Sequence, residues 1–166
     1  MAIGPGLHIE DPTDPSLDLT MSEGARPIYD RVRAFIADEV EPVTLEFHQL
    51  GAERTDHWGY HPGQMDILDG LKTKAREVGL WNLFLPDAET GEGLSNLDYA
   101  YIASELGKNP LASESLNCSA PDTGNMEVLE RVGTPEQKKQ WLEPRLNLSL
   151  IHTSEPTRRY ASSYAV

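Results

Sequence analysis

The sequence contains little cysteine and no long apolar run. Cys118 is the single cysteine among 166 residues, which excludes an internal disulfide and is typical of proteins that work in a reducing cytoplasm. No apolar run approaches the roughly 20 residues that a membrane-spanning helix needs. The first 25 residues hold no lysine or arginine, which does not fit a secretory or mitochondrial leader. We therefore expect a cytoplasmic protein that does not enter a membrane.

Basic residues are also few. The chain has 14 Lys and Arg against 27 Asp and Glu, for a net charge of -13. Such a surface repels the phosphates of nucleic acids and the headgroups of anionic lipids, so neither is an expected partner. It also disfavours a phosphorylated ligand unless the phosphates bind mainly elsewhere.

The common catalytic and metal-binding motifs are missing as well. The chain has no P-loop, no Gly-x-Ser-x-Gly elbow and no zinc-binding spacing, and the turn at residues 91–93 (GEG) lacks the third glycine of a dinucleotide site. His57 and His61 are four residues apart, but a glycine and a proline beside them oppose a helix. We predict no catalytic residue, no cofactor-binding residue and no metal site in this chain. Cys118 is expected to be a small buried side chain rather than a nucleophile.

Composition divides the chain into three parts. Residues 1–25 are acidic, rich in proline and without periodicity, which predicts a mobile arm. Residues 26–147 carry the helical pattern. Residues 148–166 have no helical period, lose the acidic bias and resemble library adapter DNA translated at the end of a sequencing read. We interpret this last part as a non-native tail, and the encoding genomic nucleotides decide the point.

The middle part predicts an all-α bundle of five or six helices, since no sustained β alternation occurs in it. The expected helices cover residues 27–50 with a kink at Pro42, 64–78, 95–106, 112–117 and 121–132, followed by one that starts at Pro135 and is limited by Pro144. Residues 52–63 are expected to form a surface loop, and residues 80–86 a buried extended crossing. The side chains predicted to face the core include Val78, Trp81, Phe84, Met126, Leu129, Val132, Trp141 and Leu142.

The stretch from Asn117 to Leu129 is the most informative one. Its front is small and polar, and its second half is amphipathic. Ser119 and Asp122 have the spacing of a capping box, with Pro121 in the first turn of the helix. We interpret the stretch as a corner between two helices whose side chains line a cavity.

Five segments in order resemble the N-terminal helical domain of acyl-CoA dehydrogenases. They are residues 79–86 (GLWNLFLP), 91–95 (GEGLS), 101–107 (YIASELG), 117–126 (NCSAPDTGNM) and 133–144 (GTPEQKKQWLEP). The fourth segment is similar to the branch that includes acyl-CoA dehydrogenase family members 10 and 11. The resemblance covers about residues 26–146.

The resemblance implies an enzyme that is larger than this chain. Family members add a middle β-barrel and a C-terminal helical bundle, and they bind FAD between these two domains and a neighbouring subunit. A glutamate of the C-terminal domain removes the α-proton of an acyl-CoA while hydride passes to the flavin, which gives the 2,3-enoyl-CoA. The implied partners are the acyl-CoA substrate, an electron-transferring flavoprotein and further copies of the chain. This chain ends before the barrel, so as an N-terminal fragment it is expected to be inactive alone.

The same resemblance makes the corner one wall of the acyl cavity. We expect Leu116, Cys118 and Ser119 to contact the acyl group, with the alternative that Leu116 and Cys118 are ordinary core and Ser119 only a cap. A second interpretation of the whole chain stays open, in which it is an acidic helical module that binds another protein and catalyses nothing.

Overall fold

The chain folds into helices joined by short connections. The computed structural model describes residues 18–55 and 59–146, and these ranges contain no strand. The helical elements are α1 (Arg26–Phe35), η2 (Ile36–Val40), α2 (Glu41–Glu53), α3 (Pro62–Glu77), α4 (Asn96–Leu106), α5 (Pro110–Ser115), α6 (Asp122–Val132), α7 (Pro135–Gln137), η3 (Lys138–Leu142) and α8 (Glu143–Leu146). Because α1–η2–α2 and α7–η3–α8 are each continuous, the described residues form six helices, and the predicted all-α class is confirmed.

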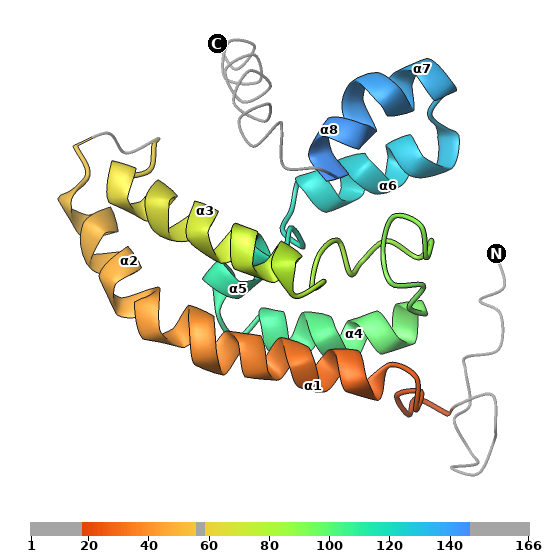
Figure 1. Ribbon diagram of the computed structural model, residues 1–166, viewed down its shortest axis with the longest axis horizontal. Helices are drawn as coiled ribbons and strands as arrows, with labels where there is room; N and C mark the ends of the chain where they lie inside the picture. Colours follow the sequence, from red (N-terminus) through yellow and green to blue (C-terminus); the bar gives the residue numbers. More distant parts are fainter. Residues whose placement is uncertain (1–17, 56–58, 147–166) are drawn as a thin grey trace, which may run out of the picture.

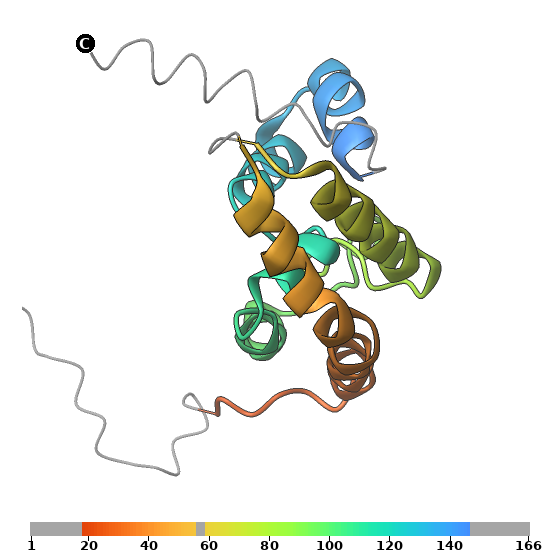
Figure 2. The ribbon, with the colours of Figure 1, turned by 90° about the vertical axis from the view of Figure 1, so that its left-hand side faces the viewer.

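Both continuous helices contain a π turn immediately before a proline. Glu41 precedes Pro42 and donates its N–H to the carbonyl of Ile36, five residues back; Glu143 precedes Pro144 and donates to Lys138 in the same way. A proline ring inside a helix clashes with the carbonyl four residues back, and widening the preceding turn relieves the clash. The predicted single bent helix is confirmed, and the bend between α1 and α2 is plain in Figure 2. The prediction that Pro144 limits its helix is wrong, because α8 continues to Leu146.

Helices α1 to α5 enclose the larger of two hydrophobic cores, which we call the main core. In this part α3 packs on α2 and α5, and α1 packs on α4 (Figure 1). The apolar stripe of the first helix supplies Val32, Phe35, Ile36 and Val40, all of them buried. Further buried members are Leu68, Leu71, Ala75, Leu80, Leu83, Ile102, Leu106, Leu111, Ala112 and Leu116.

Helices α6 and α7–η3–α8 form an antiparallel hairpin with a small core of its own. This hairpin core contains Leu85, Met126 and Leu142, with Phe84, Leu129 and Leu146 packed beside them. Thr134 opens the second helix of the hairpin through a capping box with Gln137, as predicted. In Figure 1 the hairpin stands beside the α1–α5 body and meets it through the green segment between α3 and α4.

Three side chains predicted to face the core are exposed instead. Val132 is 76% exposed, Trp141 45% and Val78 47%. Trp81 and Phe84 are half-buried and pack against the main core and the hairpin core respectively. The hairpin explains the first two, since its core needs only Met126, Leu142 and their neighbours to cover Leu85. The opposite faces of its two helices therefore stay open to solvent.

The connection before α3 also differs from the prediction. His61, which was expected in a surface loop, is the N-cap of α3. Its Nδ1 accepts from the N–H of Gly63, and its own N–H donates to Oε1 of Gln64. His57, residues 1–17 and the interpreted tail at 148–166 lie outside the described residues. Within the described residues no group of His, Cys, Asp and Glu could hold a metal ion.

Part of the predicted arm contacts the domain. Ser22 donates from its N–H to Asp98 Oδ1 at 2.8 Å and from Oγ to Oδ2 at 3.1 Å. Ala25 is buried, Met21 packs on the main core, and the Tyr101 hydroxyl donates to the carbonyl of Leu19 at 2.5 Å. Leu19 and Ser22 thus contact α4.

Candidate functional site

The segment between α3 and α4 lies between the two cores. Leu80 and Leu83 enter the main core, whereas Leu85 enters the hairpin core. Asn82 turns the backbone between them with a φ of 55°, a left-handed conformation that asparagine tolerates better than most residues. A Cβ at Gly91 would collide with the carbonyl oxygen of Leu85, so glycine permits the close return of the chain there.

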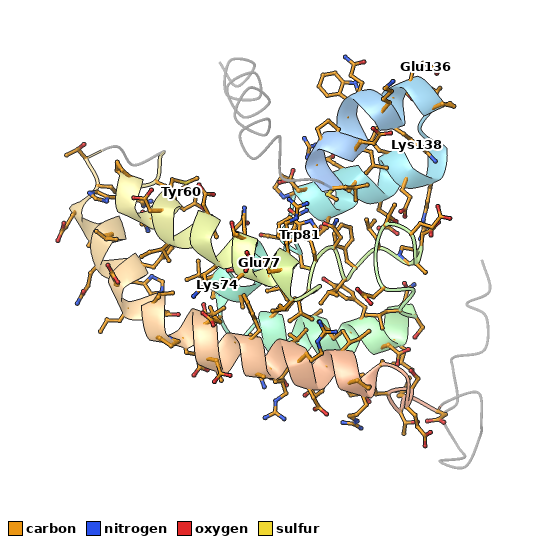
Figure 3. The ribbon with its side chains drawn as sticks, viewed as in Figure 1. Tyr60, Lys74, Glu77, Trp81, Glu136 and Lys138 are labelled. Carbon is orange, nitrogen blue, oxygen red and sulfur yellow. The ribbon has the colours of Figure 1, made fainter. Side chains whose placement is uncertain are left out.

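Trp81 connects this segment to the end of the hairpin. Its indole N–H donates to the carbonyl of Leu146 at 2.9 Å, and the guanidinium of Arg76 lies 5.7 Å from its ring centre. Figure 3 shows Trp81 where the C-terminal end of α3 approaches the hairpin. The hydrogen bond fixes α8 against the body of the domain.

The corner that the sequence singled out connects α5 to α6. Asn117 has a φ of 55° and donates from Nδ2 to Oδ1 of Asn82 at 2.7 Å, while Asn82 donates its N–H to the carbonyl of Leu116 at 3.2 Å. The predicted capping box is wrong, because α6 begins at Asp122 after Pro121 with no side-chain cap. Ser119 caps nothing with its hydroxyl, whose one hydrogen bond here is a 3.4 Å contact to the carbonyl of Ala120.

The structure brings the three predicted site residues together but gives them different surroundings. Leu116 is 0% exposed and belongs to the main core. Cys118 is half-buried and packs against that core, and Ser119 is half-buried at the turn. Of the three, Cys118 and Ser119 have accessible surface that a ligand could contact directly. Leu116 lies in the main core beneath them and has no accessible surface.

Two aromatic residues that sequence reasoning did not assign to the site surround Cys118. The Tyr99 hydroxyl of α4 lies beside the thiol, and the ring of Tyr99 lies 6.5 Å from that of Phe84 at an angle of 61°. The thiol donates in turn to the carbonyl of Leu116 at 3.4 Å. No spacing signal joins Phe84, Tyr99 and Cys118, because they come from three separate segments.

Burial determines the protonation of this group. Removal from water raises the pKa of the Cys118 thiol to about 11, although the N–H of Leu83, the Tyr99 hydroxyl and the N–H of Phe84 act in the opposite direction. Burial is also the main cause that raises the pKa of Tyr99, and the neighbouring thiol adds to it. Both groups therefore stay protonated near neutral pH, and the wall that they form is uncharged.

A separate hollow of about 510 Å³ shares no lining residue with this wall. It is lined mainly by the first helix and the end of α4, and its rim combines Arg33 and Lys108 with Glu41 and Glu105. The Tyr29 hydroxyl donates to Glu105 at 2.8 Å, and Lys108 pairs with the same carboxylate at 2.7 Å. Its charged rim suits an acyl chain less well than the uncharged wall at Cys118.

No helix in the described ranges is long and apolar enough to cross a bilayer. The expected cytoplasmic location stays a prediction.

The comparisons with known proteins agree on one family. Residues 22–148 match the family described as acyl-CoA dehydrogenase, N-terminal domain. The chain is 44% identical over 133 residues to acyl-CoA dehydrogenase family member 10 of Mus musculus, covering 76% of this chain and 12% of the relative. It is 47% identical over 119 residues to family member 11 of Gallus gallus, covering 70% and 14%.

A solved structure supports the same assignment. It is that of a protein from Mycobacterium abscessus assigned to the acyl-CoA dehydrogenases, with 46% identity and a TM-score of 0.66, covering 77% of this chain and 32% of the other. The chain thus spans less than a third of the length of these three relatives. The matched residues include the hairpin, the corner and the segment between the cores, and the chain belongs to the acyl-CoA dehydrogenase family, of which it carries the N-terminal domain.

Proposed function

We propose that this chain forms the wall at the acyl end of the substrate site in a flavin-dependent acyl-CoA dehydrogenase. The complete protein would oxidise an acyl-CoA to the 2,3-enoyl-CoA, with FAD as the hydride acceptor. The observation that carries the proposal is the uncharged wall of Phe84, Tyr99 and Cys118 between the two cores. An acyl chain needs apolar surface without competing charge, and these three side chains provide it.

The distribution of charge supports this placement. Residues 26–147 hold 21 acidic and 12 basic residues, a balance of -9. Such a domain favours the apolar end of an acyl-CoA over its phosphates, which would then contact other parts of the protein. Cys118 and Ser119 are the proposed contact residues, and Leu116 is the proposed support behind them.

The described residues do not themselves fit a flavin site. Every buried side-chain nitrogen and oxygen in these ranges has a hydrogen-bond partner, so no buried polar group is left to receive a cofactor. We accordingly assign the flavin, the catalytic base and the hydride step to other parts of the complete protein. An electron-transferring flavoprotein as electron acceptor and a homo-oligomeric assembly belong to the same proposal and rest on family membership alone.

Two preparations test the proposal. The first is the 166-residue chain, which we expect to contain no flavin absorbance after purification with added FAD. The second is the product of the extended genomic reading frame, which we expect to bind FAD and to reduce an artificial electron acceptor when acyl-CoA is added. A yellow 166-residue product would contradict the assignment of the flavin site. A flavin-loaded complete protein that oxidises none of a series of acyl-CoAs would contradict the activity.

One observation favours a second candidate function. The outer faces of the hairpin expose Val128 and Val132 on α6 and Trp141 on η3, which is unusual apolar surface for a solvated helix. An acidic module that docks another protein would present such a surface. This alternative requires a natural stop codon soon after the matched region, whereas the enzyme requires the reading frame to continue.

A further inference from the structure

Two aromatic side chains meet at the junction of the two cores. Phe84 packs with the hairpin core and Tyr99 with the main core, so their edge-to-face contact joins the two. Both rings are half-buried, whereas the neighbouring Leu83 and Leu85 are 0% exposed. The apolar surface that remains open at this junction therefore includes the two rings.

The Tyr99 ring has packing partners on two sides. It projects from α4, whose adjacent Ile102 is fully buried and anchors the helix. The ring packs against the main core on one side and against the ring of Phe84 on the other. Its hydroxyl lies beside the thiol of Cys118, which donates to the carbonyl of Leu116 at 3.4 Å. Because these contacts restrict the movement of the ring, it forms a rigid boundary of apolar surface.

We propose that Tyr99 determines substrate specificity, and that its ring, backed by Phe84, limits the length of the acyl chain that the complete protein accepts. The inference rests on the proposed function, since it requires the corner at Cys118 to be the acyl wall. The ligand part concerned is the terminal, unsubstituted hydrocarbon end of an acyl-CoA. Tyr99 takes no part in proton or hydride transfer.

The test uses the complete protein with Tyr99→Ala, Tyr99→Leu and Tyr99→Phe, and measures kcat/KM over a straight-chain acyl-CoA series. Removing the ring opens space, and each methylene in an apolar pocket changes kcat/KM by roughly 10- to 200-fold. We expect Tyr99→Ala to raise kcat/KM for chains longer than the original optimum, relative to that optimum, by about tenfold or more. Tyr99→Leu should shift the profile less. Tyr99→Phe keeps the ring and should keep the profile.

Tyr101→Ala is the matched control. Tyr101 lies two residues further along α4, is 37% exposed, and uses its hydroxyl to bind the carbonyl of Leu19 on the outer side of the domain. The ratio of kcat/KM values for two substrates does not depend on how much of the enzyme is folded, so a general loss of stability cannot imitate the shift. If Tyr99→Ala is too unstable to purify, Tyr99→Leu provides the same comparison.

The outcomes separate this inference from the proposed function. A shift of the profile in Tyr99→Ala or Tyr99→Leu, without one in Tyr99→Phe and Tyr101→Ala, supports it. An unchanged profile in both ring-deleting variants of a protein that does oxidise acyl-CoA overturns the inference alone. A complete protein with no acyl-CoA oxidation overturns both.

Discussion

Asn117 donates a hydrogen bond from Nδ2 to Oδ1 of Asn82 at 2.7 Å, and both residues hold a left-handed backbone with a φ of 55°. The bond joins the corner before α6 to the segment between the cores. Asn82 is only 2% exposed, so water cannot replace the amide easily. The position of the candidate wall therefore depends on two turns that stabilise each other.

Asn82→Ala tests this dependence. Alanine in a left-handed conformation costs about 1–2 kcal/mol, and the loss of a buried hydrogen bond adds about 1–3 kcal/mol. We expect the free energy of unfolding of the 166-residue chain, measured in urea, to fall by roughly 2–5 kcal/mol, which combines these two costs.

Asn82→Gly separates the two contributions. Glycine adopts the left-handed backbone freely and removes only the amide, so it should cost less than alanine. Asn96→Ala, at an exposed position in the first turn of α4, should change the stability little. Equal losses for Asn82→Gly and Asn82→Ala would show that the backbone conformation contributes nothing.

Much of the fold follows from local sequence signals. The stripe from Val32 to Val40 fixed the inner face of the first helix, and Thr134 with Gln137 fixed the start of the last one. The cap at His61 was missed because histidine is an uncommon cap, although Pro62 and Gln64 stand at the usual positions after it.

The site was less predictable because its contacts join distant segments. The sequence indicated the corner and Cys118, but the contacts of the thiol with Tyr99 and with the backbone beside Phe84 arise only from tertiary packing. Helical periodicity also placed Val132 in the core, because it detects an apolar face without showing whether enough structure exists to cover it. Because the hairpin core is small, Val132 stays exposed.

Met126→Ala measures the contribution of the hairpin core. Met126 is 0% exposed between Leu85 and Leu142, and truncating a buried methionine costs about 2–5 kcal/mol. We expect a loss in this range in urea unfolding. Leu129→Ala should cost less, since Leu129 is only half-buried.

Val128→Ala is the control for this helix. Val128 is 60% exposed, so the expected change is within about 0.5 kcal/mol. A loss of less than about 1 kcal/mol for Met126→Ala would show that the hairpin core is not formed in solution.

Asp98→Asn tests how the residues before α1 are held. The N–H of Ser22 is the main cause that holds the pKa of the Asp98 carboxyl below its ordinary 3.8, and the Ser95 hydroxyl, which donates at 2.7 Å, adds to it. The folded protein therefore stabilises the carboxylate form of Asp98. Its contribution to stability is present above pH 3.8 and is lost as the pH falls through the lower pKa of the folded state.

Urea unfolding at a series of acidic pH values checks this expectation. The difference in stability between the unsubstituted chain and Asp98→Asn should be constant near neutral pH and shrink below pH 3.8. Asp69→Asn, at an exposed site on α3, serves as the control and should lower the stability little. A difference that is the same at all pH values would mean that the charge of Asp98 makes no contribution.

The pH dependence of Cys118 alkylation tests whether burial raises the pKa of the thiol. Burial raises the pKa of the thiol from its ordinary 9.0 to about 11. Only the thiolate reacts with iodoacetamide, so alkylation of the folded chain should accelerate with pH up to about 11, whereas the urea-unfolded chain should show a midpoint near 9.0.

The raised pKa of Cys118 also predicts how the stability of the chain depends on pH. The unfolded state loses its proton first, so the stability that depends on the neutral thiol is present below pH 9.0 and is lost as the pH rises toward 11. Comparison with Cys118→Ala isolates this contribution from other groups that titrate at high pH. A folded chain whose thiol titrates at its ordinary value would show that burial does not raise the pKa of Cys118.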